Sequence, residues 1–304
     1  MIARSWLFVP GDSERKLARA LASPADAVVL DLEDSVAPAR RAAARELIAH
    51  TLGDRAARAG KPLWVRVNGL ASGALLEDLA AVAPGAPDGI VLPKIARAAE
   101  ILEVHHYLVA LEAREGLAPL TIRVLVIATE TAAAVLGLGS LAEALRIGAS
   151  ASACRPRLAG LTWGAEDLSA ALGAARRRDA DGSLAFTFEL ARTLSLLAAA
   201  AAGVQAIDGV YGDIRDAAGL ARELARARGD GFTGKLAVHP DQVPPINAAF
   251  VPTEGEIEQA RRIVAAFAAS PEVGVTSIDG RMVDRPHLLM AERLLARAAA
   301  LAGQ

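Results

Sequence analysis

The stretch "AVVLDLEDSV", residues 27–36, places three carboxylates directly after a run of aliphatic residues. Apolar runs of this length are typical of strands that are buried on both faces, as in parallel sheets. Asp31, Glu33 and Asp34 follow this run within a few positions. Burying carboxylates is costly unless each has a positive partner, a metal ion or water. The stretch therefore predicts a buried strand that ends at a charged site.

Short apolar runs of the same kind recur along the chain, separated by longer stretches rich in Ala, Leu, Glu and Arg with helical spacing. The runs are SWLFV, AVVLDL, LWVRV, GIVLP, RVLVIAT, AGLTW, AIDGV and KLAVH. Strands that alternate with helices predict βα units and a parallel sheet. Eight such units before residue 240 are the number that closes a (β/α)8 barrel. We therefore predict an α/β fold: a TIM barrel over residues 1–248 with a C-terminal hairpin and helices over residues 249–304.

An open, doubly wound sheet is the alternative fold, and it would need a dinucleotide-binding fingerprint. The stretch "GLGSLA", residues 137–142, has the G-x-G-x-x-A spacing. A helical stretch beginning at Thr131 separates it from its strand, whereas the fingerprint needs its glycines in the turn directly after the strand. We interpret these residues as a loop between two helical pieces and prefer the barrel.

Composition excludes several classes of protein. The 33 Lys and Arg residues nearly balance 35 Asp and Glu residues, and a net charge of -2 gives no reason to expect a nucleic-acid partner. Arg and Glu interrupt the Ala-rich runs before they reach the length of a membrane span. The single Cys154 excludes an internal disulfide, and residues 1–16 lack the long apolar segment of a secretory signal. We expect a soluble, cytoplasmic protein without a membrane or nucleic-acid partner.

The predicted strands share one property, which is that polar residues follow each of them at the C-terminal end. These residues are Asp12, Asp31, Glu33, Asp34, Arg66, Asn68, Lys94, Glu130, Glu166, Asp167, Asp208, Tyr211 and His239. Active sites of TIM barrels lie at this end of the strands. The pattern predicts a polar mouth that all the strands share.

Glu130 and Asp167 follow the fifth and sixth strands, which are neighbours in a barrel. Two carboxylates suit a hard cation such as Mg²⁺, with Mn²⁺ as an alternative, and no His or Cys cluster has zinc spacing. Arg66, after the third strand, could hold a substrate carboxylate or stabilise a developing oxyanion. The alternative is that these three residues form a buried ion network that only closes the barrel end.

Basic residues gather near the first two strand ends. Arg15, Lys16 and Arg19 follow "PGDSE", and Arg40 follows "EDSVAPA". Helix starts with Arg and Lys nearby are natural sites for phosphates, although the same residues could simply be solvated helix faces. His239, in "AVHPDQ", either lines the substrate pocket at the barrel mouth or caps the eighth strand.

These motifs together resemble those of the citrate lyase β-subunit-like proteins in the HpcH/HpaI aldolase superfamily, relatives of malyl-CoA and citramalyl-CoA lyases. The resemblance runs in order from Arg4 to about Leu295. Its motifs are RSWLFVPGDSERKLARA, ADAVVLDLEDSVAPARR, VRVNG, GIVLPK, IATETAAAV, LTWGAEDLS, AIDGV, GFTGKLAVHPDQV and GRMVDRP.

The resemblance implies roles for residues of the mouth and of the basic cluster. Glu130 and Asp167 match the Mg²⁺ ligands of the family, and Arg66 matches the arginine that contacts the reacting carbonyl. Glu33 and Asp34 match an acidic pair beside the metal. The residues that match the family's contacts to CoA phosphates are Arg15, Arg19 and Arg40, with Lys16 beside them in the basic cluster.

The activity that the resemblance implies is that of a Mg²⁺-dependent carbon–carbon lyase. It would cleave or form a malyl-, citramalyl- or citryl-type 3-hydroxyacyl-CoA, with an acyl-CoA and a 2-oxo acid as the small-molecule partners. A malyl-CoA-type thioesterase is one alternative. A citrate lyase β subunit acting on an acyl-carrier-protein thioester is another.

The stretch "VGVTSIDGRMVDRPH" lies beyond the eighth strand. Asp279-Gly280 predicts the turn of a hairpin, and Pro286 predicts the start of a terminal helix. Asp284 could be a surface acid before that helix, where any carboxylate is favourable. The resemblance implies instead that Asp284 is a general acid or base that reaches a neighbouring subunit's barrel mouth. It thus implies a C-terminal extension that packs on a neighbour in a homotrimer or homohexamer.

Overall fold

The computed structural model describes residues 2–58, 60–144 and 157–303, so Cys154 lies outside the described residues. The chain divides into two compact units, which are considered separately below. One is Ala3–Asn247, and the other contains Ala248–Gln304 together with the first two residues of the chain.

Parallel strands of the first unit form a closed barrel in the order β1-β2-β3-β4-β5-β6-β7-β8, with β8 pairing back to β1. The strands are β1 (Ser5–Pro10), β2 (Ala27–Asp31), β3 (Leu63–Arg66), β4 (Gly89–Leu92), β5 (Arg123–Ile127), β6 (Leu158–Thr162), β7 (Gln205–Asp208) and β8 (Gly234–Ala237). Each overlaps one of the apolar runs of the sequence. The predicted TIM barrel is therefore confirmed.

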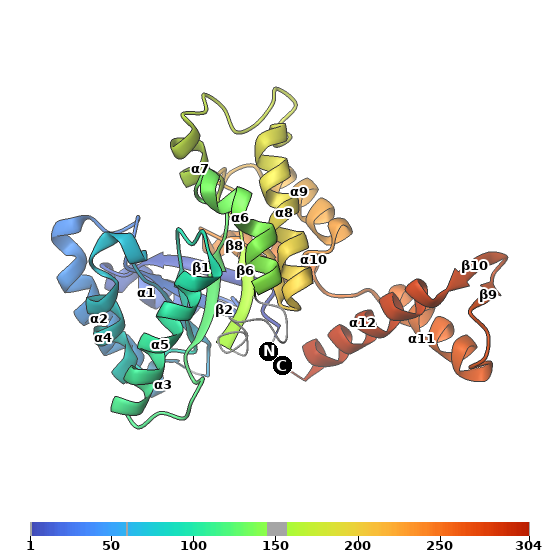
Figure 1. The fold of residues 1–304 in the computed structure, drawn as a ribbon, viewed down its shortest axis with the longest axis horizontal. Coiled ribbons are helices and arrows are strands. Elements are labelled where there is room, and N and C mark those ends of the chain that lie inside the picture. Colours follow the sequence, from blue (N-terminus) through green and yellow to red (C-terminus); the bar gives the residue numbers. More distant parts are fainter. Residues whose placement is uncertain (1, 59, 145–156, 304) are drawn as a thin grey trace. The chain divides into compact units, whose positions relative to one another are not determined.

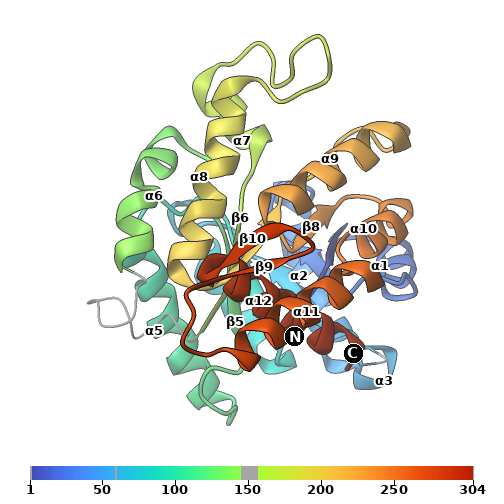
Figure 2. The same ribbon diagram turned by 90° about the vertical axis from the view of Figure 1, so that its right-hand side faces the viewer.

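Helices connect successive strands and surround them (Figures 1 and 2). They are α1 (Glu14–Leu21), α2 (Arg41–Gly53), α3 (Arg55–Arg58), α4 (Leu75–Val82), α5 (Ala98–Arg114), α6 (Ala132–Ala144), α7 (Ala165–Leu172), α8 (Phe186–Ala202), α9 (Ala217–Asp230) and α10 (Val243–Ala249). The described helices include none that is both long enough and apolar enough to cross a membrane.

The interpretation of residues 137–142 as a loop is wrong, because α6 runs through all of them. The glycine at position 137 has a packing role within this helix. A Cβ atom at this position would lie only 2.7 Å from the carbonyl oxygen of Ala96. The glycine therefore allows α6 to approach the segment before α5 closely, and it does not form a phosphate-binding turn.

The barrel interior consists of side chains that alternate along the strands. Trp6 and Trp64 pack edge to face with ring centroids 4.9 Å apart, and Val29 lies in the same buried cluster. Gly89 makes room for this packing, since a Cβ atom there would lie 2.2 Å from the Trp64 ring. Side chains two positions apart on a strand share a face. Asp31 therefore continues the inward face of Val29 and opens onto the C-terminal mouth.

The second unit contains an antiparallel hairpin between two helices: α11 (Glu254–Ala269), β9 (Val275–Ile278), β10 (Arg281–Asp284) and α12 (Arg285–Ala302). Asp279 and Gly280 form its turn with φ angles of 51° and 74°, which is the left-handed pair that a two-residue type I′ turn requires. Phe267, Ile278 and Val283 form a small core between α11 and the hairpin. The predicted hairpin and terminal helix are confirmed.

Candidate active site at the barrel mouth

Asp31 and Arg66 form a buried pair at the ends of β2 and β3, where they are direct partners in the strand register. Arg66 donates from Nε to Asp31 Oδ1 and from Nη2 to Asp31 Oδ2, both at 2.6 Å. Burial on its own would raise the pKa of the Asp31 carboxyl, but the hydrogen bonds and charge of Arg66 hold that pKa below its usual range. The guanidinium is thereby fixed in one orientation.

The remaining edge of Arg66 faces two further acids. Its Nη1 lies 3.0 Å from Glu33 Oε2 and 3.4 Å from Asp34 Oδ2. The guanidinium carbon also lies 5.2 Å from the centre of the Phe8 ring. Although burial disfavours the charged form, Asp31 raises the pKa of Arg66, so the side chain stays cationic. Arg66 thus stays a fixed positive charge among three carboxylates, and its contact with a substrate stays a prediction.

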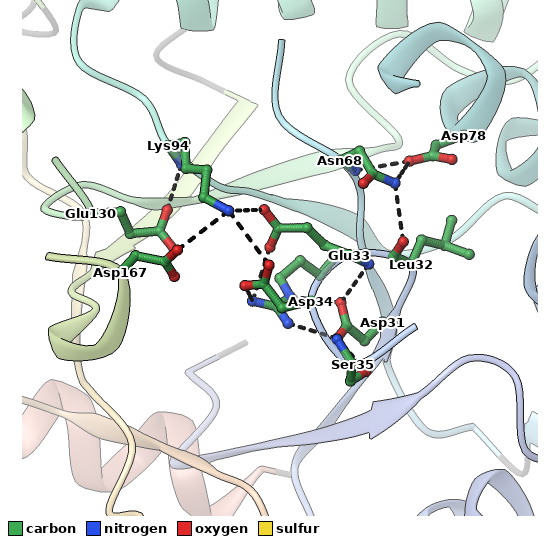
Figure 3. Close-up of polar contacts among 11 residues, drawn as sticks. Asp31, Leu32, Glu33, Asp34, Ser35, Asn68, Asp78, Lys94, Glu130 and Asp167 are labelled. Atoms are coloured by element: carbon green, nitrogen blue, oxygen red, sulfur yellow. Dashed lines mark hydrogen bonds and ion pairs between the residues drawn. The ribbon is translucent and has the colours of Figure 1, made fainter. Parts of the chain in front are cut away.

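Lys94 connects these acids to the other side of the mouth, and Figure 3 shows its side chain between the two groups. Its Nζ lies 2.7 Å from Glu33 Oε1, 3.5 Å from Asp34 Oδ1 and 3.4 Å from Asp167 Oδ1. Neither Lys94 nor Asp31 was assigned a site role from the sequence. The available signal was their position, because each directly follows an apolar strand run at the C-terminal end.

Glu130 is buried, and the Lys94 backbone N–H donates to its Oε2 at 2.5 Å. Burial raises the pKa of Glu130 well above its ordinary value; the Lys94 N–H opposes this rise, and the negative charge of Asp167 adds to it. The prediction that Asp167 lies at the end of β6 is wrong, because β6 ends at Thr162. Asp167 lies in the first turn of α7, where the helix dipole favours a carboxylate.

Glu130 and Asp167 nevertheless lie on the same side of the mouth (Figure 3). Within the described ranges, no cluster of three or more His, Cys, Asp or Glu residues has the geometry to hold a metal ion. A pair of carboxylates is still sufficient for Mg²⁺, which keeps several waters or substrate oxygens. A divalent cation would also offset the burial of Glu130 and its repulsion by Asp167. The residues present therefore fit a hard cation.

Asp208 does not contribute to the mouth, contrary to the prediction from its position at the end of β7. Ile207 belongs to the barrel interior, so the next side chain points toward the helices. Asp208 accepts from Lys235 Nζ at 2.8 Å, from Arg192 Nε at 3.0 Å and from Trp163 Nε1 at 2.8 Å. It is part of a buried ion network between the strands and α8.

Of the predicted phosphate-binding residues, Arg15 and Lys16 lie in the first turn of α1, Arg19 lies in its last turn, and Arg40 directly precedes α2. Arg15, Lys16 and Arg19 are exposed on α1. Arg40 is also exposed, and it approaches Asp12 with its Nη2 3.3 Å from the backbone oxygen and its Nε 3.5 Å from Oδ2. The basic side chains of the two helix starts thus flank the β1–α1 loop. Their binding to phosphate stays a prediction.

His239 has the geometry of a cap. Its Nδ1 accepts from the backbone N–H of Asp241 at 3.3 Å, and it starts the short 3₁₀ helix Pro240–Gln242. This contact accounts for the capping alternative. A role of His239 toward a ligand stays a prediction.

Asp284, in the second unit, is the N-cap of α12. Its carboxylate lies 2.5 Å from Nδ1 of His287. The hydrogen bond from His287 lowers the pKa of Asp284 below its usual range, so this carboxylate is ionised at neutral pH. Its action in a neighbouring subunit's site stays a prediction.

Known proteins resemble the chain over nearly its whole length. It is 37% identical to a (3S)-malyl-CoA thioesterase of Cereibacter sphaeroides, over 98% of this chain and 95% of that protein. It is 35% identical to the citrate lyase subunit beta of Escherichia coli, over 97% and 93% of the two chains. Protein CitE from Mycobacterium tuberculosis, solved in complex with magnesium, acetoacetate and coenzyme A, is 35% identical with a TM-score of 0.75, over 98% of each chain.

The sequence profile of one family matches residues 4–240, which span the barrel. The family is described as HpcH/HpaI aldolase/citrate lyase. The match covers more than half of the chain, and the named relatives agree with it. The chain therefore belongs to the HpcH/HpaI aldolase/citrate lyase family.

Proposed function

We propose that the protein is a Mg²⁺-dependent carbon–carbon lyase that cleaves or forms a 3-hydroxyacyl-CoA of the malyl, citramalyl or citryl type. The products of cleavage would be an acyl-CoA and a 2-oxo acid. The observation that carries the proposal is the arrangement of carboxylates around Lys94, which contacts Glu130 and Asp167 on one side and Glu33 on the other (Figure 3). Glu33 in turn contacts Arg66, which Asp31 holds in place. The CitE relative, whose complex contains magnesium, acetoacetate and coenzyme A, supports the same ligand classes here.

Glu130 and Asp167 are the residues that would hold Mg²⁺. When bound, the ion would act as a Lewis acid for the hydroxyl and carboxylate oxygens of the substrate. Glu33 and Asp34 would accept hydrogen bonds from water beside this site, since both carboxylates face the mouth. Mn²⁺ is an alternative occupant, because it prefers the same oxygen ligands.

Arg66 would bind the substrate oxygen that gains negative charge. Asp31 occupies its Nε and Nη2, so a substrate oxygen would approach the Nη1 edge, where Glu33 and Asp34 lie. A donor that is already held in place needs little reorganisation when charge develops on a nearby oxygen. Arg66 thus orients the 2-oxo acid and stabilises the transition state for carbon–carbon cleavage.

Asp284 would move the proton at the carbon next to the thioester. As a carboxylate, it would accept the proton when the carbon–carbon bond is formed and return it when the bond is cleaved. We place it in a neighbouring subunit's mouth, with residues 249–304 packing on that neighbour in a homotrimer or homohexamer.

The exposed Arg15, Lys16, Arg19 and Arg40 would bind the phosphates of CoA. His239 would lie near the thioester.

Thioester hydrolysis is the second candidate, favoured by the 37% identity to a (3S)-malyl-CoA thioesterase. The same mouth and CoA site would bind the substrate, but water would attack the thioester carbonyl. Free CoA and a hydroxy acid would then form, without a 2-oxo acid. The identity to citrate lyase subunit beta favours a third form of the substrate, in which the thioester is carried by an acyl-carrier protein.

Product analysis distinguishes these reactions. Purified protein is incubated with Mg²⁺ and either (3S)-malyl-CoA or citramalyl-CoA, and the products are followed by mass spectrometry. A lyase yields acetyl-CoA together with glyoxylate or pyruvate, whereas a thioesterase yields free CoA with malate or citramalate. Absence of any Mg²⁺-dependent consumption of these thioesters, of citryl-CoA, and of their acyl-carrier-protein forms would contradict the proposed function.

A further inference from the structure

Lys94 has a backbone conformation that side chains rarely adopt. Its φ is 58°, in the left-handed region, directly after Pro93 at the exit of β4. Glycine adopts this region readily because it has no Cβ atom. In a lysine, the Cβ atom comes close to the backbone carbonyl oxygen, which makes this conformation unfavourable. Strained positions of this kind persist where the surrounding structure enforces them, often at functional sites. The surrounding structure therefore holds Lys94 in an unfavourable conformation at this position.

Both ends of Lys94 are used in the mouth. Its backbone N–H donates to Glu130, which follows β5, while its Nζ lies 3.4 Å from Asp167 in the first turn of α7. The same Nζ donates to Glu33 at 2.7 Å and lies 3.5 Å from Asp34, both of which follow β2. Lys94 alone thus contacts carboxylates that follow three other strands (Figure 3).

We propose that Lys94 is a positioning residue that fixes the carboxylates of the cation site, through its main chain at Glu130 and through its ammonium group at Asp167 and Glu33. This inference rests on the proposed function, because it assigns Glu130 and Asp167 to Mg²⁺. The left-handed turn at Lys94 is the device that brings the N–H and the side chain into the same mouth.

The exposure of the acids explains why such a residue is needed. The Asp34 and Asp167 side chains are 49% and 30% exposed, so either could turn toward water. Like charges repel, and the acids of one mouth would separate without a cation between them. An ammonium group at Lys94 keeps Asp167 directed inward and shares Glu33 with Arg66.

Two possible roles of Lys94 predict opposite changes in Mg²⁺ affinity when its charge is removed. If Lys94 were only a nearby positive charge, its removal would strengthen the attraction of the mouth for Mg²⁺. If Lys94 positions the carboxylates, its removal weakens Mg²⁺ binding, because ordering the ligands then costs part of the binding free energy. The direction of the change in affinity therefore separates the two explanations.

Calorimetric titration of the substrate-free protein with Mg²⁺ provides the test. Lys94→Met keeps the chain length and the backbone N–H but lacks the charge, and we expect its Kd for Mg²⁺ to rise about tenfold, the size that loss of an outer-shell partner typically has. Lys94→Arg, which keeps a cation, should stay much closer to the wild-type Kd. Unchanged or tighter Mg²⁺ binding by folded Lys94→Met would overturn the proposal. If the wild-type protein itself binds no Mg²⁺, the assignment of the metal, and with it the proposed function, fails instead.

A second pair of variants tests the backbone device. Lys94→Gly and Lys94→Ala both lack the ammonium group and differ only in the Cβ atom. We expect Lys94→Gly to melt a few degrees higher than Lys94→Ala, as the left-handed conformation requires, and both to bind Mg²⁺ as weakly as Lys94→Met. A higher melting temperature for Lys94→Ala would contradict the role of the turn. Should Lys94→Met fail to fold, Lys94→Gly takes its place in the titration.

Discussion

The Asp31–Arg66 pair shows what a buried carboxylate contributes when it serves another side chain. Asp31→Asn would leave the Nε and Nη2 groups of Arg66 beside a neutral partner, with Glu33 and Asp34 only at its Nη1 edge. Breaking a buried ion pair on one side costs about 3–5 kcal/mol, so we expect the free energy of unfolding in urea to fall by roughly that amount. Because Arg66 then loses its fixed orientation, kcat should fall as well.

The matched control is Asp26→Asn, in another bidentate pair of the barrel. Arg4 donates to Asp26 at 2.7 Å and 2.8 Å, but this pair does not contact any of the carboxylates of the mouth that are described above. We expect a loss of stability with kcat preserved. Equal effects of both substitutions on kcat would show that Asp31 acts only through stability.

Glu130 and Asp167 are predicted to be metal ligands, and their amide variants test this directly. Glu130→Gln or Asp167→Asn should lower Mg²⁺-dependent turnover by more than 100-fold, beyond the roughly 10–100-fold that the loss of an outer-shell partner costs. The melting temperature should change little, since each amide keeps the shape of its acid. Glu166→Gln is the control, because Glu166 precedes Asp167 on α7 and pairs instead with Arg177 at 3.4 Å. Full activity of either ligand variant in EDTA would contradict the assignment.

At the scale of secondary-structure elements, α1 and the start of α2 carry the predicted contacts to CoA phosphates. Changing Arg15, Arg19 or Arg40 to Ala should raise the KM for the acyl-CoA about tenfold, since a hydrogen bond to a charged group contributes roughly 1.5–3 kcal/mol. The effect should be much smaller with a truncated pantetheine thioester, which lacks those phosphates. Arg114→Ala, an exposed arginine at the end of α5, is the control. Equal losses with both thioesters would point away from phosphate binding.

The buried pair between α5 and β6 predicts a pH dependence of stability. Arg157, just before β6, contacts both carboxylate oxygens of Glu112 at 2.7 Å, and its Nε donates to Nδ1 of His105 at 3.1 Å. That nitrogen must be unprotonated to accept. Burial first, and then the charges of Arg157 and His106, lower the pKa of His105 below its ordinary value, while Glu112 opposes the shift.

A histidine whose pKa is lowered by folding binds protons more readily in the unfolded chain. Stability is therefore lost as the pH falls below the ordinary value of about 6.5 and is retained above it. We expect His105→Gln to reduce the loss of unfolding free energy between pH 7.5 and pH 5, measured by urea denaturation. His106→Gln, on the exposed side of α5, should change that slope much less, because its charge contributes less to the shift at His105 than burial and Arg157 do. An identical slope for His105→Gln and the wild-type protein would contradict this account.

At the scale of the whole molecule, the barrel and the hairpin could be predicted from the sequence, because both depend on local patterns. Apolar runs mark the strands, and Asp279-Gly280 fits a turn that needs two positive φ angles. The direction of single side chains could not be predicted in the same way. The pairing of β5 with β6 shifts register between Val124 and Leu125, and such a shift breaks the simple alternation from strand to strand.

The missed features of the mouth have related causes. Asp167 was placed at a strand end because no signal marked the short loop before α7. The role of Lys94 depends on a left-handed backbone that its residue type does not indicate. Asp208 could face inward or outward, and only its contacts to Lys235 and Arg192 show that it faces the helices. Positions of polar residues near strand ends were predictable, whereas their partners required the three-dimensional structure.

At the scale of the assembly, Glu130 and Asp284 belong to different compact units of the chain. If Asp284 acts in a neighbouring subunit, each active site takes Glu130 from one chain and Asp284 from another. Asp284→Asn and Glu130→Gln should then each be inactive alone. Asn is as good an N-cap residue as Asp, so Asp284→Asn should keep α12 folded.

Subunit exchange between the two inactive variants tests this arrangement. In a random equal mixture, about a quarter of the sites of a symmetric oligomer would pair an intact Glu130 with an intact Asp284, and about a quarter of wild-type activity should return. If both residues served the same chain's site, every site would lack one of them and no activity would return. Light scattering should give a trimer or hexamer, and isotope-labelled subunits should verify the exchange. No recovery after verified exchange, or a fully active monomer, would defeat the proposal of a shared site.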